Sequence, residues 1–289
     1  MKAIGTFTHA LQRRRTSIRI ASLLLLFGLL TACKTSQEAL SAANQLANVS
    51  QKLSAYYTDL SKQTEDSISL NQIQEAVMEL PAAPRAQAEL ETTRLELAKR
   101  AALANSMNNL AIAYAELAGS KSVSDIATAA SGFANQCSQI RQLPGGPAVP
   151  ELVGQAGGLL VEAIRERKLK QSSEAISNAV AAVDKLYHDE MKEYESINQD
   201  RAAVAAQIAE HMVTRENVVD ASLLLALALK QFDLSATVPP GQTPAKYRNL
   251  AVNVIHTRRD QQISNFVTTT DEMGEMLAAV DKQIAGLTK

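Results

Sequence analysis

The chain of 289 residues contains no tryptophan, and aromatic residues make up only 4% of it. Aromatic side chains line many small-molecule and carbohydrate sites, so the composition disfavours sites of these kinds. The sequence also lacks a nucleophile elbow, paired cysteine–histidine zinc spacing, a haem-attachment motif and a dinucleotide-binding fingerprint. We therefore expect no catalytic residues and no dissociable cofactor.

Acidic residues are also absent from the N-terminus, since none precedes Glu38. Five basic residues occur in the first 19 positions: Lys2, Arg13, Arg14, Arg15 and Arg19. An apolar run of 11 residues, 20–30, follows them. A basic stretch before a short apolar run is the layout of a secretory signal peptide, and a spanning helix needs about 18 apolar residues or more. We therefore expect residues 1–32 to be removed rather than kept as a membrane anchor.

The residues after this run are Leu30-Thr31-Ala32-Cys33. This tetrapeptide resembles the lipobox of bacterial lipoprotein precursors, although the resemblance covers the signal only and not the rest of the chain. It implies cleavage between Ala32 and Cys33, a diacylglyceryl group on the Cys33 thiol and usually an acyl group on the new amino terminus. Two or three acyl chains hold a protein stably on a bilayer, whereas one holds it only marginally. The alternative is an ordinary cysteine after an ordinary signal peptide.

The residue after Cys33 is Lys34. In enterobacterial lipoproteins an aspartate at this place favours retention in the inner membrane. The resemblance therefore implies a lipid anchor in the outer membrane on its periplasmic face, with the inner membrane as the less favoured location.

The region expected to remain, residues 33–289, is acidic. Residues 1–32 carry five basic and no acidic side chains, so the remaining 257 residues carry 24 basic and 30 acidic ones, a net charge of −6. Nucleic-acid binding normally requires a basic stripe, so we expect no nucleic-acid partner. If Cys33 carries lipid, Cys137 has no partner for a disulfide within the chain, and the fold must depend on its hydrophobic core.

Proline is confined to three clusters, at 81–84, 144–150 and 239–244. Proline breaks helix interiors, so these clusters divide the chain into segments 36–80, 85–143, 151–238 and 245–289. Each segment is rich in Ala, Leu, Gln, Glu and Lys, which favour helix. Apolar residues recur at steps of three and four in the first two segments. These rows are Leu46, Val49, Leu53, Tyr56 and Leu60; Leu70, Ile73, Val77 and Leu80; Leu103, Met107, Leu110, Tyr114 and Leu117; and Val123, Ile126, Ala130, Phe133, Cys137 and Ile140.

The last two segments show longer repeats of the coiled-coil kind. In the third, Glu190 interrupts one heptad row and Arg201 interrupts the other. The rows are Ile176, Val183, Ile197 and Val204; Val180, Tyr187, Tyr194 and Ile208; and, in the last segment, Phe266, Met273, Leu277, Val280, Ile284 and Leu287. We predict an all-α fold, an elongated antiparallel helical bundle with coiled-coil-like long helices. One helix over 173–234 would be about 90 Å long, and a break near Asn217 remains the alternative.

Two residues with metal-ligand chemistry, Asp184 and His188, lie four positions apart on the third segment. This spacing places both on one helix face, and the acidic residues Asp189, Glu190 and Glu193 are near. The Glu-x-x-His signature of di-iron bundles does not occur, and only three histidines lie beyond residue 32. The favoured interpretation is a solvated charged face with pairing between residues four apart, and a metal site is the alternative.

Three further features have an ordinary structural interpretation. Cys137 lies on an apolar row and is expected to be a small buried residue rather than a reactive thiol. Gly154, Gly157 and Gly158 lack the Lys-Ser/Thr ending of a phosphate loop, so we expect a turn or close helix packing. A basic run, formed by Arg165, Arg167, Lys168 and Lys170, suits a helix end, with lipid headgroups as the alternative contact.

The most apolar stretch beyond the signal is 218–229, in which only Asp220 and Ser222 are not apolar. It is too short to span a membrane and should be buried on all sides. Our leading hypothesis is a non-enzymatic lipoprotein that holds or positions another envelope protein, with self-association also open. The alternatives are a membrane-active bundle that conceals 218–229, and a metal-binding or enzymatic bundle around His188.

Overall fold

A computed structural model describes the backbone over residues 5–78, 85–118, 123–165, 169–214 and 245–287. Within these ranges it describes side chains in 37–76, 85–118, 125–162, 172–212, 214 and 252–287. The described residues form α1 (Gly5–Met78), α2 (Gln87–Ala118), α3 (Val123–Gln139), α4 (Glu151–Arg165), α5 (Leu169–Thr214) and α7 (Ala245–Gly286). No strand occurs within these ranges, so the predicted all-α fold is confirmed.

The helix boundaries follow the proline and glycine signals. α2 begins three residues after Pro84, and α4 begins directly after Pro150, where the missing N–H of proline costs no helical hydrogen bond. α2 ends at Ala118, directly before Gly119, and glycine is common just after the last residue of a helix. The two apolar rows of the first segment lie on one continuous helix, because α1 runs through both of them to Met78.

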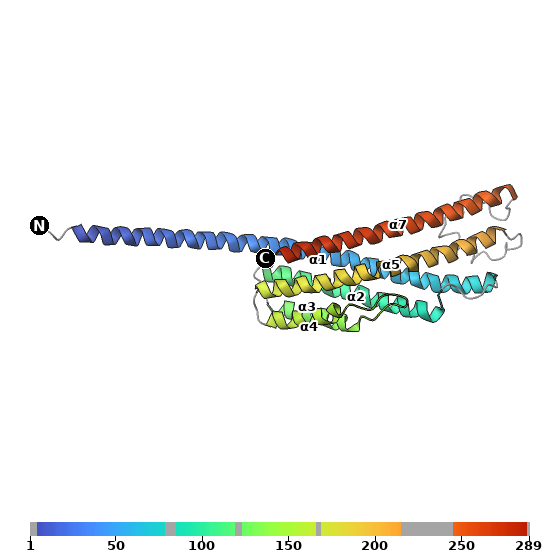
Figure 1. Ribbon diagram of the computed structural model, residues 1–289, viewed down its shortest axis with the longest axis horizontal. Coiled ribbons are helices and arrows are strands. Elements are labelled where there is room, and N and C mark those ends of the chain that lie inside the picture. The colour runs from blue at the N-terminus through green and yellow to red at the C-terminus, as the bar shows by residue number, and fades with distance from the viewer. Residues whose placement is uncertain (1–4, 79–84, 119–122, 166–168, 215–244, 288–289) are drawn as a thin grey trace.

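Four long helices, α1, α2, α5 and α7, form the body of the bundle (Figure 1). Contacts fix their directions. Ser54 on α1 bonds to Ala101 on α2, and Ser61 bonds to Arg94, so these helices are antiparallel. Tyr57 contacts Tyr194, and Gln74 contacts Gln207, so α1 and α5 run parallel. α7 is antiparallel to α5, because Glu210 pairs with His256 while His188 lies against Gly274.

The two short helices, α3 and α4, form a hairpin against α2 and α5 that covers only one half of the bundle's length (Figure 1). Their contact is close at Gly157 of α4. A Cβ atom added there would lie 2.6 Å from the Cα of Ala134 on α3. The absence of a side chain at this position therefore sets the distance between the two helices, as the packing interpretation of the glycine-rich patch predicts.

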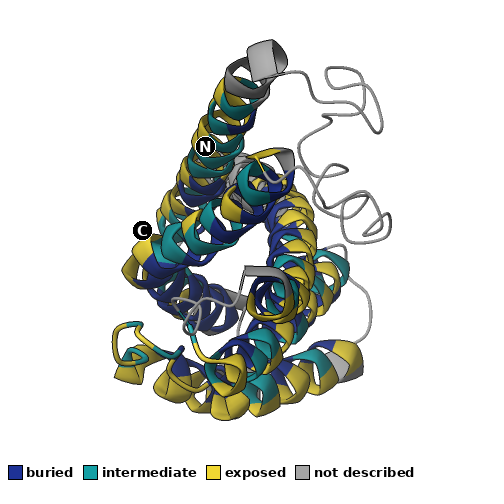
Figure 2. Cartoon of the chain, turned by 90° about the vertical axis from the view of Figure 1, so that its right-hand side faces the viewer, coloured by how far each residue is buried: buried dark blue, intermediate teal, exposed yellow. Residues whose placement is uncertain are grey.

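The apolar rows form the core, and Figure 2 shows the buried residues on the sides of the helices that face one another and the exposed residues on the outer sides. Leu46, Leu53 and Leu60 of α1 are at most 1% exposed, and Met107, Leu110 and Tyr114 of α2 are equally buried. On α5 all eight apolar residues of the two heptad rows are at most 4% exposed. Burial of these rows is the main favourable contribution to folding, about 1.5–3 kcal/mol for each large side chain.

The third segment is only partly described. α4 and α5 are separate helices, and α5 ends at Thr214, so its 46 residues extend about 69 Å. The expected continuation to Leu234 and the apolar stretch 218–229 lie outside the described residues. Within the part of the chain that the structure describes, no helix is long and apolar enough to cross a membrane.

Candidate functional site: a buried polar layer

The core of the bundle contains an ion pair between Arg100 of α2 and Glu190 of α5. Their side chains are 0% and 1% exposed. Arg100 donates through Nε to Glu190 Oε2 at 2.7 Å and through Nη2 to Oε1. Nη1 donates to the backbone oxygen of Glu96 at 3.1 Å, and Nη2 also donates to the backbone oxygen of Arg141 at 2.9 Å. The charge of Arg100 is therefore compensated without solvent, in the two-point geometry that suits a guanidinium and a carboxylate.

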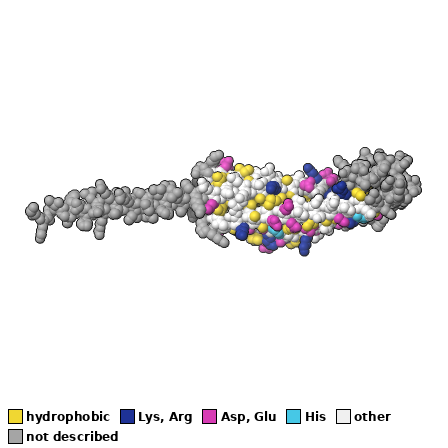
Figure 3. Space-filling model, turned by 90° about the horizontal axis from the view of Figure 1, so that it is seen from above, with side chains coloured by type: hydrophobic (Ala, Val, Ile, Leu, Met, Phe, Trp, Pro, Cys, Tyr) yellow, Lys and Arg dark blue, Asp and Glu magenta, His cyan; other side chains and the backbone are white. Residues whose placement is uncertain are grey.

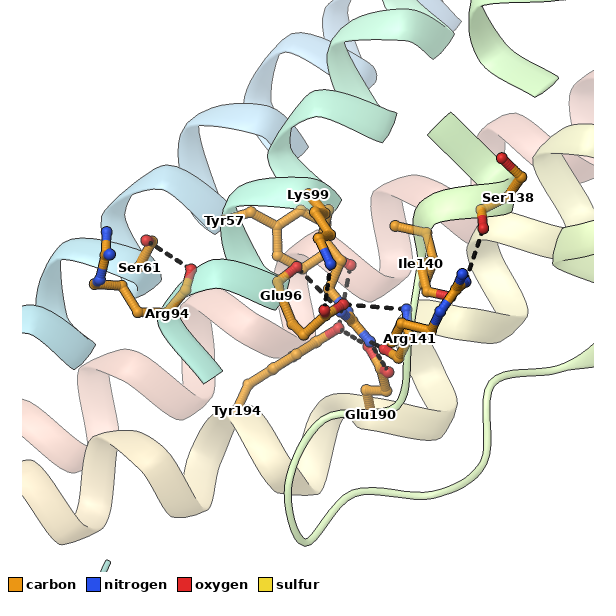
Figure 4. Close-up of polar contacts among 11 residues, drawn as sticks. Tyr57, Ser61, Arg94, Glu96, Lys99, Ser138, Ile140, Arg141, Glu190 and Tyr194 are labelled. Carbon is orange, nitrogen blue, oxygen red and sulfur yellow. Dashed lines mark hydrogen bonds and ion pairs between the residues drawn. The ribbon is translucent and has the colours of Figure 1, made fainter. Parts of the chain in front are cut away.

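Two tyrosines extend this pair toward α1. Tyr194 donates its hydroxyl proton to Glu190 Oε2 at 2.5 Å, and the hydroxyl oxygens of Tyr194 and Tyr57 are 3.2 Å apart. Figure 4 shows Tyr194 directed at the Glu190 carboxylate, while Tyr57 approaches the Tyr194 hydroxyl from a different helix. The network therefore connects three of the four long helices, α1, α2 and α5, at one level of the bundle.

The same tyrosines belong to a tyrosine cluster, which we define as Tyr56, Tyr57, Tyr187 and Tyr194. Each pair within it that involves Tyr56 has ring centroids 5.7–6.0 Å apart in an edge-to-face arrangement. Phe266 of α7 stacks on Tyr56, and the Tyr187 hydroxyl donates to the Thr270 carbonyl oxygen at 2.8 Å. Aromatic pairs of this kind contribute about 0.5–1.5 kcal/mol beyond area burial, so the cluster attaches α7 to the bundle.

Burial sets the electrostatics of this layer. Desolvation raises the pKa of Tyr57 and of Tyr194 well above the usual value for tyrosine, and nearby Glu190 raises both further. Burial lowers the pKa of Arg100, but the hydrogen bond to Glu190 and the nearby Tyr194, Glu190 and Tyr57 together raise it by more. Both tyrosines are therefore neutral and Arg100 is charged at neutral pH.

Glu96 joins the α3–α4 connection to this layer. Its Oε2 accepts the backbone N–H of Arg141 at 3.1 Å, and its Oε1 accepts from Lys99 at 2.6 Å (Figure 4). The Arg141 guanidinium in turn donates to the Ser138 carbonyl oxygen at 2.7 Å, at the end of α3. These bonds satisfy backbone groups where the chain leaves the helix, and they hold the short hairpin on α2.

A second polar cluster lies where α2 begins. The guanidinium of Arg85, 10% exposed, donates to Glu193 at 2.6 Å, to Asp200 at 2.9 Å and to Ser196 at 3.0 Å, all on α5. Burial lowers the pKa of Arg85, but its bonds to Asp200 and Glu193 raise it by more. Gly145, with a left-handed φ of 77°, lies against Glu193 Oε2. The cluster attaches both the start of α2 and the α3–α4 connection to α5.

The positions of charged residues on the apolar rows of the sequence indicate this layer. Glu190 occupies the heptad position between Val183 and Ile197. A charged residue at such a position indicates either that the apolar row is interrupted or that the charge is buried with a partner. Extending the α2 row backward from Leu103 by steps of three and four reaches Arg100 and Glu96, which are 0% and 5% exposed. The interpretation of Glu190 and Glu193 as part of a solvated face is wrong, because both are buried against arginine.

The predicted pairing of Asp184 and His188 is observed. His188 Nδ1 lies 3.2 Å from Asp184 Oδ1, and the Nε2 side of the ring packs over Gly274 of α7. Burial raises the pKa of Asp184, against the opposing effect of His188, and burial followed by Asp184 raises the pKa of Asp281 on α7. The described residues contain no group of three or more His, Cys, Asp or Glu residues able to hold a metal ion.

The other sequence candidates fall in separate places. Cys137 is 4% exposed, and burial raises its pKa to about 12, which fits the expected unreactive thiol. Ala32 and Cys33 lie on α1, but their side chains are outside the description. In the basic run Arg165 ends α4, as expected for a helix terminus, and Lys170 lies in the first turn of α5. Arg167 and Lys168 lie outside the described residues.

The arrangement is suited to holding helices in register. Both oxygens of Glu190 accept hydrogen bonds, and the Arg100 and Glu190 side chains are closed to solvent. A buried pair of this kind penalises any shift of α2 along α5, because a shift leaves a charge without its partner. Comparisons of the chain with protein-family models, with curated proteins and with solved structures found no match.

Proposed function

We propose that this protein is a lipid-anchored, non-enzymatic component of a bacterial envelope, held through Cys33 at the periplasmic face of the outer membrane. Its helical bundle acts there as a rigid spacer that holds or positions another envelope protein. The observation that carries the proposal is the signal-like N-terminus ending in Leu30-Thr31-Ala32-Cys33. The rigid, solvent-closed polar layer described above is consistent with a structural role.

The place of Cys33 along α1 suits an anchor. The first buried side chain of α1 among those described is Ala39, 3% exposed, six residues after Cys33. Six helical residues extend about 9 Å, so a lipid on Cys33 puts the end of the bundle next to the headgroups. The 40 residues from Ala39 to Met78 extend α1 about 60 Å, so the opposite end of the bundle would lie that far from the bilayer.

The surface offers several apolar contacts for a partner. Leu152 and Leu159 of α4 are each 51% exposed and lie two turns apart, and Leu95 and Ile112 of α2 are 49% and 47% exposed. On the face seen in Figure 3, acidic and basic side chains are interspersed with hydrophobic and neutral ones. Such a mixed surface fits a protein partner better than a polyanion.

Lipidation is tested by replacing Cys33 with serine in cells that carry the protein. We expect an unprocessed precursor or loss from the membrane fraction, measured by fractionation and by intact mass. Cys137→Ser serves as the control and leaves processing and anchoring unchanged. If Cys33→Ser is still cleaved and anchored, the anchor is not the lipid and the proposal is wrong.

The spacer role is tested by in-cell cross-linking of the anchored protein, followed by mass spectrometry of the captured proteins. We expect one recurrent partner in stoichiometric amount, lost when Cys33→Ser removes the protein from the membrane. Turnover of an envelope substrate by the purified protein, or capture of no partner above background, would contradict this role even if lipidation is confirmed.

A further inference from the structure

The buried face of α1 changes from apolar to polar along its length. Between Ala39 and Leu60 most of its buried side chains are apolar. Beyond Leu60, four of the five buried side chains that the structure describes on α1 are polar: Thr64, Ser67, Asn71 and Gln74, with Leu70 as the fifth. Thr64 and Ser67 donate to backbone oxygens of α1 itself, each at 2.9 Å, so these bonds do not join α1 to another helix. Apolar burial is the main source of packing stability, so α1 is held less tightly in this part.

The hydrophobic core is interrupted at the same level. One cluster of buried apolar side chains, which we call the proximal core, extends to Leu60 on α1 and to Ile197 on α5. Ten buried apolar side chains among the described residues do not belong to it: Leu70, Leu90, Ala202, Val204, Ala205, Ala206, Ile208, Ala209, Met212 and Ile255. Four of the ten are alanines, which bury little surface. A small cavity lies between the two groups, since its lining includes both Ile197 and Val204.

Two amide pairs cross from α1 to α5 in this part of the bundle. Asn198 donates to Gln63 at 2.8 Å, and Gln74 donates to Gln207 at 3.1 Å. Asn198 and Gln74 are 2% and 5% exposed, yet the carbonyl oxygen of each of these two side chains accepts no hydrogen bond from the described residues. Burying a polar atom without a partner destabilises the closed bundle, because the atom would be hydrated if the helices separated.

Fewer helices pack together at this end of the bundle. Ser61 of α1 bonds to Arg94 at 3.2 Å, so α2, which begins seven residues before Arg94, starts level with Ile68 of α1. α3 and α4 lie beside the other half of the bundle (Figure 1). Past Ile68, the described helices at this end are therefore α1, α5 and α7. Glu210 of α5 contacts His256 of α7 at 3.5 Å, but the two side chains are 42% and 41% exposed, so this contact contributes little.

We propose that the distal segment, defined as residues 64–76 of α1, 201–212 of α5 and 252–262 of α7, opens as one unit while the proximal core stays folded. Segments with few buried apolar contacts open at a lower free energy than the core of a protein does. Once separated, each of these helix ends is too short to be stable in water on its own. The break lies at the level of Leu60 and Ile197, where the proximal core ends.

The Arg100–Glu190 pair sets where the opening stops. Tyr194, which donates to Glu190, contacts Tyr57, three residues before Leu60, so the buried polar layer lies at the end of the proximal core. A shift of the helices at this level would leave a buried charge without its partner. The open state is a minor state of the closed bundle, and it leaves the part of the proposed spacer up to Leu60 rigid. The inference does not depend on the proposed lipid anchor.

Thiol labelling of the purified full-length protein tests the opening. Val204 lies in the distal segment and Val183 in the proximal core, on the same heptad row of α5, and they are 4% and 2% exposed. Val204→Cys and Val183→Cys are labelled separately with a maleimide, and mass spectrometry of the modified peptide gives the rate at each site. We expect Val204→Cys to react roughly tenfold faster, and faster still in dilute urea, because opening exposes buried surface. Equal rates at the two sites, or a Val204→Cys rate that urea does not change, overturn the proposal.

Amide hydrogen exchange provides a second measurement. In the unmodified protein we expect residues 64–76 and 201–212 to exchange roughly tenfold faster than residues 42–60 and 179–197. Gln74→Leu removes a buried polar group and should slow exchange in the distal segment alone, whereas Gln72→Leu, on the same turn of α1 but exposed, should leave it unchanged. Equal exchange in the two parts, or slower exchange in both parts with Gln74→Leu, contradicts the opening. The thiol comparison does not use this variant, so it decides the question even if Gln74→Leu fails to fold.

Discussion

Arg100 of α2 and Glu190 of α5 meet through two hydrogen bonds inside the core, although 90 residues separate them in the sequence. Tyr194 donates to the same carboxylate, so neither oxygen of Glu190 lacks a donor. A buried charge is costly unless it is paired, and here the pairing fixes the level of α2 against α5.

Replacing one member of this pair should destabilise the protein far more than replacing both members together. Arg100→Met leaves Glu190 buried with only Tyr194 as a donor, and we expect a loss of about 3–5 kcal/mol in the free energy of unfolding. Arg100→Met with Glu190→Met together should cost much less than the two single changes added. Urea unfolding followed by circular dichroism measures all three variants.

The exposed pair Lys185–Asp189, with side chains 51% and 32% exposed, is the matched control for this cycle. Its coupling energy should be within about 1 kcal/mol of zero. If the double variant loses as much free energy of unfolding as Arg100→Met and Glu190→Met added together, the two charges do not compensate each other in the core.

Replacing the glycines of α4 with alanine should change the stability of the protein in opposite directions, depending on the position. Gly157→Ala places a Cβ 2.6 Å from the Cα of Ala134, so we expect a loss of about 1–3 kcal/mol through overpacking. Gly154→Ala and Gly158→Ala meet no atom within 4 Å and should gain about 0.5–1 kcal/mol from helix propensity. Thermal unfolding midpoints of the three variants check the signs, and a stabilising Gly157→Ala would mean that α3 and α4 are not in close contact.

Asp281 should destabilise the native protein at neutral pH. Burial and the nearby Asp184 raise its pKa, and its buried Oδ1 accepts no hydrogen bond from the described residues. The native state therefore holds the proton more tightly than the unfolded chain does, and stability falls as the pH rises above the unfolded value of about 4. We expect Asp281→Asn to raise the free energy of unfolding at pH 7 by roughly 0.5 kcal/mol, since the group is partly solvated.

The pH dependence distinguishes this cause from a general effect of asparagine. The gain from Asp281→Asn should disappear as the pH falls below about 4, where Asp281 is protonated in both states. Urea unfolding at several pH values measures it. A gain that persists unchanged in acid would show that charge is not the cause.

The tyrosine cluster should make the protein sensitive to alkali. Burial raises the pKa of Tyr57, Tyr187 and Tyr194, so these groups stay neutral in the native state when the unfolded chain ionises above about pH 10. Stability contributed by the cluster is complete below that pH and is lost as the pH rises beyond it. Tyrosinate absorbance should therefore appear together with the loss of helicity, and tyrosinate formed by most tyrosines in a fully helical protein would contradict the burial of the cluster.

The sequence by itself determined the local architecture. Proline clusters marked where the helical segments are divided, and steps of three and four identified the buried rows of α1, α2, α3 and α5. Helix breaking and amphipathic periodicity are properties of neighbouring residues, so the sequence alone contains them. No proline lies between α4 and α5, and the basic run that begins at Arg165 was the only sequence signal for the end of α4.

Only the tertiary structure decided what the charged residues on those rows do. Glu190 was visible as an interruption in a heptad row, but its partner Arg100 lies on another helix, and the energy of a charge depends on what surrounds it in space. The same holds for Gly157, whose role is set by Ala134 of the facing helix, and for Asp281, whose pKa depends on Asp184 across the interface between α5 and α7. Which residues pair across two helices depends on the axial register in which the helices pack. The local sequence pattern of a single helix does not specify that register.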